Sequence, residues 1–271
     1  MSDVTVSSGR LRILRTGQQG CLLEAGGQKI GIDLYLSDSP RRLLPNMVQP
    51  EDLADVLLLF GTHNHLDHID KPAWSQIAAL NPRIRFVVPA FCRESIPRDC
   101  QIDPGRFIFV DEQEPADYQG IRIDAIAASH EFLDTDPQTG RHPHLCYLIR
   151  WQGWQIFHAG DTCRYDGFAA KINSFGSPDI AFLPINGRDA VRYASGCIGN
   201  LTYQEAVDLA GDIRPRLTIP GHYDMFAHNG EDPQRFGQYM TVKYPDLAWR
   251  ILPVGETMDY PANITNKEKV K

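Results

Sequence analysis

The stretch GTHNHLDHID, residues 61–70, carries three histidines and an aspartate within six positions: His63, His65, Asp67 and His68. It follows the apolar run DVLLLF, residues 55–60, and precedes a helix-like segment, so we expect a loop at the end of a buried strand. A loop can direct several such side chains to one point, whereas a helix or a strand cannot. Imidazole and carboxylate groups without a thiolate suit zinc, iron, manganese or a similar ion, so the stretch predicts a metal site. A histidine-rich surface loop is the alternative, but the whole chain has only nine histidines in 271 residues.

The composition is that of a globular chain with a sizeable buried core. Apolar residues make up 42% of the sequence and charged residues 23%. The formal charge of -7 offers no sign of the basic patch on which nucleic-acid binding depends, so we expect no nucleic-acid partner. The first ten residues do not resemble a secretion signal, and no apolar run has the length of a membrane span. We therefore expect a cytoplasmic protein without a membrane partner.

The cysteines are scattered, without a C-x-x-C pair, and we expect most of them to be reduced core residues. They are Cys21, Cys92, Cys100, Cys146, Cys163 and Cys197. Cys163 lies close to an aspartate in a G-D-T motif, so a nucleophilic role is an alternative for this residue. No partner base is in view, which makes that role the less favoured alternative.

Strand-like segments and loops alternate along the chain. An antiparallel meander is expected over residues 11–35, and residues 249–253 are expected to form the last strand. Asp33, at the end of the meander, either supports the site or caps a turn. The proline-containing loop 38–50 is expected to lie over neighbouring strand ends.

The pattern predicts one domain and a tail, without a linker between independent domains. The domain is expected over residues 1–262, as two packed halves of about 1–127 and 128–262. The polar tail, residues 263–271, is expected to be flexible.

Three further strand ends carry a histidine or an aspartate, a place where open sheets present site residues. These residues are His130 after segment 121–127, Asp161 in the G-D-T after segment 154–158, and His222 after segment 217–220. His142 and His144 lie in the polar loop 131–144. We expect them to be loop residues rather than ligands, because the chain supplies a full set without them.

Taken together, the candidate ligands are His63, His65, Asp67, His68, His130, Asp161 and His222. An H-x-H-x-D-H motif, then a distant histidine, an aspartate in a G-D-T turn and a last histidine after a strand resemble the metallo-β-lactamase superfamily. The resemblance covers residues 63–222, well over half of the chain. It implies an α/β (α+β) fold, a four-layer αββα sandwich with the site at one edge between the halves.

The resemblance also implies a role for each ligand. His63, His65 and His130 would hold a first metal ion, Asp67, His68 and His222 a second, and Asp161 would bridge them. The cofactors would be two divalent ions, zinc or manganese, with iron as a further alternative. Such ions make hydroxide available near neutral pH and polarise the bond under attack. Asp67 is the candidate catalytic residue, because it can orient that hydroxide or accept a proton.

Three longer motifs resemble the branch of the superfamily that contains bacterial L-ascorbate-6-phosphate lactonases: IPGHYDMF at 219–226, HAGDT at 158–162 and LTYQEA at 201–206. This resemblance implies hydrolysis of a small acidic or phosphorylated metabolite, with a sugar-phosphate lactone as the first candidate. A metal-dependent phosphodiesterase is the alternative, because the same hydroxide can attack phosphorus. The loop 186–200 departs from the pattern of that branch.

Candidate substrate-binding residues lie in and after that loop. Arg188 and Arg192 are candidates because guanidinium groups match phosphate, with ordinary surface arginines as the alternative. Tyr193 and Tyr223 are further candidates, as are Asp224 and His228. We expect a small-molecule substrate, and a homo-oligomer is left open. A two-iron redox enzyme and a closed structural site are less favoured, since H-x-H-x-D-H matches the hydrolytic pattern and seven ligands exceed the four of a structural ion.

Overall fold

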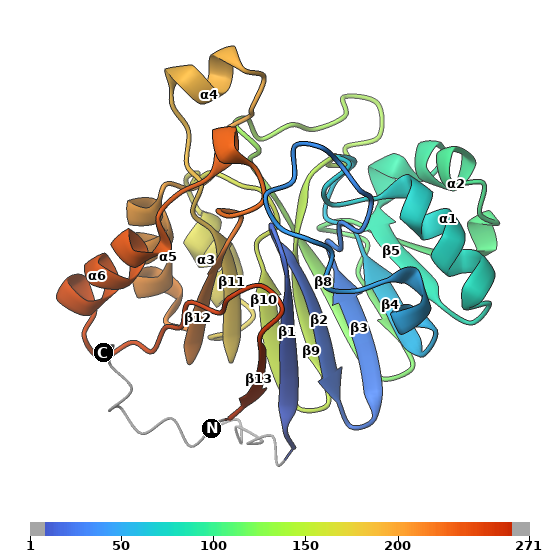
Figure 1. Cartoon of the computed structure of the whole chain (residues 1–271), viewed down its shortest axis with the longest axis horizontal. Helices are drawn as coiled ribbons and strands as arrows, with labels where there is room; N and C mark the ends of the chain where they lie inside the picture. Colours follow the sequence, from blue (N-terminus) through green and yellow to red (C-terminus); the bar gives the residue numbers. More distant parts are fainter. Residues whose placement is uncertain (1–8, 262–271) are drawn as a thin grey trace.

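The structure, a computed structural model, describes residues 9–261 as two facing β-sheets with helices on both outer sides (Figure 1). The first sheet has the strand order β13-β1-β2-β3-β4-β5-β6. Its strands are β1 (Leu11–Gly17), β2 (Gly20–Ala25), β3 (Gln28–Ile32), β4 (Val56–Phe60), β5 (Arg85–Pro89), β6 (Phe107–Val110) and β13 (Thr257–Tyr260). The second sheet has the order β12-β11-β10-β9-β8-β7. Its strands are β7 (Ala116–Tyr118), β8 (Ile121–Ala127), β9 (Leu145–Trp151), β10 (Trp154–His158), β11 (Ile180–Pro184) and β12 (Leu217–Gly221).

Helices close the sandwich on both outer faces. The α-helices are α1 (Lys71–Leu80), α2 (Ser95–Cys100), α3 (Phe168–Asn173), α4 (Ala190–Ala194), α5 (Tyr203–Ile213) and α6 (Pro233–Lys243). Short 3-10 turns are η1 (Pro50–Leu53), η2 (Ala90–Cys92), η3 (Pro104–Arg106) and η4 (Ala227–Asn229). Helices α1 and α2 flank the first sheet, and α3, α5 and α6 flank the second (Figure 1). This arrangement confirms the four-layer αββα fold.

The central strands, among them β4, β9, β11 and β12, are buried on both faces, which explains why they are apolar throughout rather than alternating. In β4, Leu58 and Phe60 point into the core between the sheets, whereas Leu59 points into the core under α1. A third core lies on the outer face of the second sheet, where Phe157 of β10 packs with Val207 of α5 and Met240 of α6. Because both faces of these strands pack against apolar side chains, the polar site residues lie in the loops at the strand ends.

The meander is antiparallel as predicted, and β3 to β6 are parallel. The predicted strand over residues 249–253 is wrong: the segment contributes only an isolated bridge between Trp249 and Thr218. The last strand is β13, which pairs with β1 and buries Met258 and Tyr260. The strand forms at residues 257–260 instead, because pairing with β1 buries these two alternate side chains. The predicted tail, residues 263–271, lies outside the described residues, and no helix within residues 9–261 is long and apolar enough to cross a membrane.

Asp70, the last residue of the GTHNHLDHID stretch, joins the metal loop to the rest of the fold. Its buried carboxylate accepts hydrogen bonds from the backbone N–H groups of Leu36 and Ser37, at 2.8 and 2.6 Å, and from the Ser37 hydroxyl at 2.6 Å. It also caps α1 by accepting from the N–H of Ala73. One carboxylate therefore fixes both the segment after β3 and the start of α1.

We predict that Asp70→Ala destabilises the fold by about 2–4 kcal/mol, because it leaves several donors in this buried region without an acceptor. Urea unfolding of the metal-loaded protein measures this loss. Asp99→Ala is the control, since it removes the exposed partner of Lys71 on the same helix and should leave the free energy of unfolding nearly unchanged. Equal losses in the two variants would contradict the role given to Asp70.

Candidate metal centre

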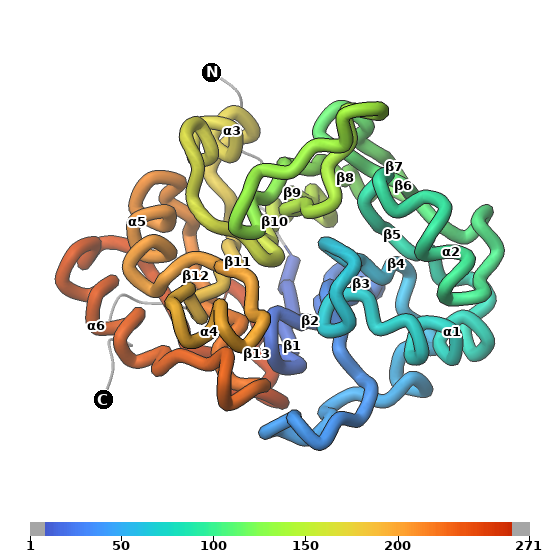
Figure 2. The backbone as a smooth tube through the Cα atoms, turned by 90° about the horizontal axis from the view of Figure 1, so that it is seen from above, coloured from blue at the N-terminus to red at the C-terminus, as the bar shows by residue number. Residues whose placement is uncertain are grey.

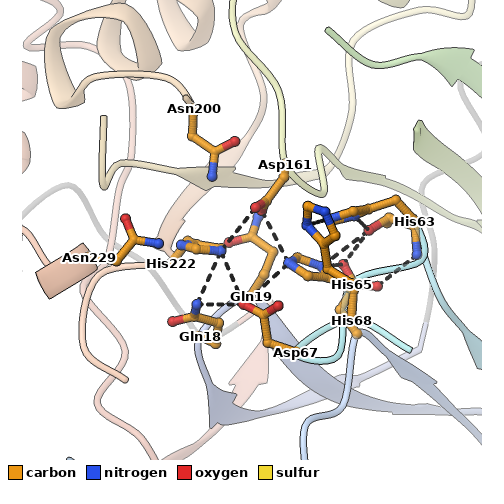
Figure 3. A network of polar contacts seen from close by, with 12 residues as sticks. Gln18, Gln19, His63, His65, Asp67, His68, Asp161, Asn200, His222 and Asn229 are labelled. Carbon is orange, nitrogen blue, oxygen red and sulfur yellow. Dashed lines mark hydrogen bonds and ion pairs between the residues drawn. The ribbon is translucent and has the colours of Figure 1, made fainter. Parts of the chain in front are cut away.

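The seven predicted ligands meet at one edge of the sandwich, although they come from four separate loops. Four lie between β4 and α1, and the others follow β8, β10 and β12: His63, His65, Asp67, His68, His130, Asp161 and His222. Figure 2 looks down on this edge, and Figure 3 shows side chains from these loops pointing toward one another. In the second sheet β8, β10 and β12 run in the same direction, because β8 and β10 are both antiparallel to β9, and β11 is parallel to both β10 and β12. Their carboxyl ends therefore lie at one edge of that sheet, and the ligands of the loop after β4 meet them there.

The side chains form three overlapping groups whose candidate ligand atoms lie within 4.8 Å of one another. The groups are His63, His65 and His130; His63, His68 and Asp161; and Asp67, His68 and His222. We call the first group trio 1 and the last group trio 2. They are the sets that the sequence resemblance assigned to the first and second metal ions.

Asp161 lies between the two trios. One of its carboxylate oxygens is 3.1 Å from His222 Nε2 and 3.7 Å from His130 Nε2, and the other is 3.4 Å from His68 Nε2. The preceding residue, Gly160, has a φ of +55°, and a Cβ there would come within 2.8 Å of the Thr62 side chain. Glycine is therefore required for the turn that brings Asp161 to the centre.

The electrostatics of the centre suit a cation. Burial, helped by the neighbouring imidazoles, lowers the pKa of His63 and keeps its ring neutral. Burial opposes ionisation of Asp161, yet His222 and His68 hold the pKa of its carboxyl well below the usual range. Against the effect of burial, the carboxylates around these two histidines in turn raise the pKa values of His68 and His222, so positive charge is favoured at this point of the interior. Histidine and carboxylate side chains are also the donor set that zinc, manganese or iron takes.

Two buried ligand atoms have no hydrogen-bond partner among the described residues: His68 Nε2 and Asp161 Oδ1. Buried polar atoms nearly always have a partner, so such orphans indicate a missing ligand. Both atoms belong to the groups described above and face each other at 3.4 Å. The residues present therefore fit a metal ion.

Asp33 supports the site, one of the two roles that the sequence left open. Its carboxylate lies 2.8 Å from His68 Nδ1 and accepts hydrogen bonds from the backbone N–H and the hydroxyl of Thr62, both at 2.8 Å. With Nδ1–H donating to Asp33, His68 keeps Nε2 free for a metal ion. The carbonyl of Gly199 does the same for His130, whose Nδ1 it contacts at 3.1 Å.

Gln18, in the β1–β2 turn, is a site residue that sequence reasoning missed. Its buried side-chain amide donates to Asp67 Oδ2 at 2.8 Å and lies 3.2 Å from His222 Nε2. Its carbonyl accepts the N–H of His222 at 2.7 Å, and both residues have a positive φ. No motif marked this glutamine, because its partners lie 49 and 204 residues away. The one local signal in the sequence is the pair of glycines, Gly17 and Gly20, which indicates a tight turn around Gln18.

The two histidines of the loop 131–144 have different environments. His142 Nδ1 bonds Asp111 at 2.7 Å, away from the candidate ligand groups. The ring of His144 lies 5.3 Å from the rings of His63 and His130, although His144 belongs to none of those groups. Burial and neighbouring imidazoles lower the pKa of His144 to about 4, so its ring is neutral beside trio 1.

The remaining candidates lie outside the ligand groups. Tyr223 is buried under the guanidinium of Arg15, which lies 4.4 Å from its ring centre, and Asp224 forms an ion pair with the same arginine. His228 lies in η4, with its ring 5.9 Å from that of Phe226. Burial raises the pKa of the Cys163 thiol, which disfavours the nucleophilic alternative.

The candidate residues of the loop 186–200 are engaged within the protein or exposed. Arg188 makes two 2.7 Å hydrogen bonds to Glu205, and Arg192 pairs with Asp189 and with the carbonyl of Gly230. Tyr193, on α4, is 68% exposed. Neither arginine therefore has a guanidinium free of protein partners.

We predict that Asp33→Asn weakens metal binding by about 10- to 100-fold, because an amide nitrogen cannot accept the proton of His68 Nδ1. Competition with a chromophoric chelator measures the affinity without requiring activity. The matched control is Asp111→Asn, which alters another buried aspartate–histidine pair outside the ligand groups and should leave the affinity unchanged. A loss of the same size in both variants would contradict a specific role for Asp33.

Comparisons with known proteins agree with this geometry. A family model described as a β-lactamase superfamily domain matches residues 31–223. The UPF0173 metal-dependent hydrolase Ta0764 of Thermoplasma acidophilum is 30% identical over 227 residues, which cover 83% of this chain and 89% of the relative. A UPF0173 metal-dependent hydrolase of Aeropyrum pernix is 29% identical over 267 residues, covering 92% and 97% of the two chains.

Solved structures share the fold. Igni18, a metallo hydrolase of Ignicoccus hospitalis, superposes with a TM-score of 0.70 at 21% identity, covering 93% of this chain and 98% of that one. The metallo-β-lactamase fold protein YhfI of Bacillus subtilis has a TM-score of 0.64 at 12% identity, covering 93% and 100%. From the family model and the curated relatives, the chain belongs to the metallo-β-lactamase superfamily and, within it, to the UPF0173 family of metal-dependent hydrolases.

Proposed function

We propose that this metal-dependent hydrolase opens a carboxylic ester or lactone of a small molecule, with two divalent ions in the site. The observation that carries the proposal is the position of Asp161, whose carboxylate lies within 3.1 to 3.7 Å of histidines from both trios. When bound, the ions would supply ionised water near neutral pH and polarise the bond under attack. In this proposal trio 1 and trio 2 each hold one ion, and Asp161 is shared between them.

The residues around the ligands fix their orientation. Asp33 and the Gly199 carbonyl hold the Nδ1–H groups of His68 and His130, so that the Nε2 atoms face the centre. Gln18 donates to Asp67 Oδ2, the oxygen that lies 3.7 Å from His222 Nε2 and 3.8 Å from His68 Nε2, and so holds this carboxylate toward trio 2. These contacts preorganise the ligands before substrate binds.

Asp67 is the proposed catalytic residue. The Asp67 side chain is 22% exposed, whereas that of Asp161 is 4% exposed. Of the two carboxylates, Asp67 is thus the one that can reach a water molecule and a substrate at the mouth of the site. We assign it the role of orienting the attacking water and accepting its proton.

The choice of metal rests on the chemistry of the ligands, and the choice of substrate on the sequence resemblance and the charges of the chain. Imidazole and carboxylate ligands accept zinc, manganese or iron, and we propose zinc or manganese. The sugar-phosphate lactone is supported by the sequence resemblance, and its phosphate would have to compete with Glu205 for Arg188 or with Asp189 for Arg192. Phosphodiester cleavage is the alternative reaction. The acidic balance of the chain favours a small molecule over nucleic acid.

We predict that removal of metal abolishes hydrolysis and that manganese or zinc restores it. The assay compares carboxylic esters, lactones including L-ascorbate 6-phosphate, and phosphodiesters on one preparation, with His65→Ala as the metal-site control. Turnover of phosphodiesters alone would favour the alternative reaction. If no ester, lactone or phosphoester in a broad panel is turned over by the loaded protein, the proposed hydrolysis is wrong.

We predict that Asp161→Ala loses one or both ions and lowers activity by at least about 100-fold, the upper end of the cost of losing a supporting residue. Metal content after dialysis is the first readout, and circular dichroism checks that the fold is retained. Asp166→Ala, an exposed position of the same loop, should keep both metal and activity. Full metal occupancy in Asp161→Ala would show that this carboxylate does not bridge the ions.

A further inference from the structure

A cavity of about 350 Å³ lies beside the metal centre, between the segment after β8 and helix α4. Its walls include Glu131 on one side and Ala190, Tyr193, Cys197 and Gly199 on the other. We call it the α4 cavity. In Figure 1, α4 lies at the top of the molecule, above the strand ends from which the ligand loops leave.

Two lining residues of the α4 cavity adjoin His130 of trio 1. Glu131 directly follows His130, and the carbonyl of Gly199 accepts the hydrogen bond from His130 Nδ1 at 3.1 Å. A group bound in the cavity would therefore lie next to a proposed metal ligand. A substrate whose reacting bond is at the ions could place a substituent there.

The walls of the cavity are mainly apolar. Ala190, Cys197, Gly199 and the ring of Tyr193 contribute apolar surface. The aliphatic part of Arg188 contributes as well, because its stem packs so closely on Gly199 that a Cβ there would lie 2.8 Å from Arg188 Cδ. Its guanidinium is held by Glu205 in two 2.7 Å hydrogen bonds. Arg188 thus presents carbon rather than a free charge.

The charges around the cavity oppose an anionic substituent. The carboxylates of Glu131 and Asp189 belong to the lining residues, and Asp189 is paired with Arg192. A phosphate entering the cavity would meet like charge, with the guanidinium of Arg188 already paired. The charges of the lining therefore favour an uncharged substituent over a phosphate in this cavity.

Exposed apolar side chains gather on the two segments that flank the cavity. Phe132 is 66% and Leu133 44% exposed on one side, and Val191 is 80%, Tyr193 68% and Ile198 38% exposed on the other. Exposed apolar side chains that gather around a site are typical of ligand-binding grooves. Here Tyr193 lines the cavity itself, and the other four lie within two residues along the chain of lining residues.

We propose that the α4 cavity binds an uncharged, apolar substituent of the substrate, an alkyl or aryl group, while the ester or lactone lies at the ions. This inference rests on the proposed hydrolase function. It assigns the loop 186–200 the role of selecting substrates by their apolar part, with Tyr193 as the main contact.

The test is a series of γ-lactones with 4-alkyl chains of increasing length, assayed with the metal-loaded full chain, and a matching series that ends in a carboxylate. We expect kcat/KM to rise by up to about fourfold for each buried methylene until the cavity is full. The terminal carboxylate should remove this gain. Equal kcat/KM for all chain lengths would overturn the inference.

Variants on α4 separate the cavity from the fold. Tyr193→Ser should remove the dependence of kcat/KM on chain length, and Ala190→Asp should act in the same direction by adding charge. Val191→Ser is the matched control, because Val191 is the most exposed apolar residue of the same helix and does not line the cavity. It should keep the full chain-length dependence. Loss of that dependence in Val191→Ser and retention in Tyr193→Ser would contradict the assignment.

The binding of unreactive linear alkyl amides, measured by calorimetry, tests the cavity independently of hydrolysis. If affinity rises with the length of the alkyl group in the unmodified protein and not in Tyr193→Ser, the cavity is supported. This holds even if no lactone is hydrolysed, because a lack of hydrolysis would refute only the proposed function. Hydrolysis without any chain-length effect on rate or binding would refute only the cavity. A dimer that dissociates in Tyr193→Ser, again without a chain-length effect, would identify a second copy as the occupant and overturn the proposal.

Discussion

The buried carboxylate of Asp161 is the group on which the site depends. A negative charge in a protein interior is costly unless cations or hydrogen-bond donors surround it. Here imidazoles from three different loops, those of His68, His130 and His222, surround it within 3.7 Å. The geometry brings together donor atoms that a metal ion would satisfy, and that the protein alone leaves partly unpartnered.

The two-sheet architecture makes this convergence possible. Because each sheet packs apolar side chains on both faces, the strands carry no polar site residues in their middle. The polar groups are concentrated where strands end, and β4, β8, β10 and β12 end at the same edge. A rigid apolar scaffold thus holds loops that are short enough to fix ligand positions.

A second layer of contacts sets the orientation of the ligands. Asp33 and Asp70 connect the segment after β3 to the metal loop, the first through His68 and Thr62 and the second through the start of α1. On the opposite side, Arg15 pairs with Asp224 while Gln18 holds the backbone of His222. The loop 186–200, with α4, lies farther out and carries exposed apolar side chains, which suits a role in substrate choice rather than in metal binding.

The sequence by itself predicted most of the strands from local apolar runs, and its resemblance to a known family predicted the αββα class and the seven candidate ligands. Apolar runs define buried strands, and H-x-H-x-D-H with the later histidines and aspartate marks loops that follow them. It did not determine the support of His68 by Asp33, the place of Gln18 or the pairing of β13 with β1. Nor did it show that the loop arginines are already paired, or that α4 closes a largely apolar cavity beside His130. Most of these contacts join residues far apart in the chain, and their partners are set by how the two sheets pack. Only the tertiary structure decides them, because no motif along the sequence marks which side chain of a distant loop will lie beside a given ligand.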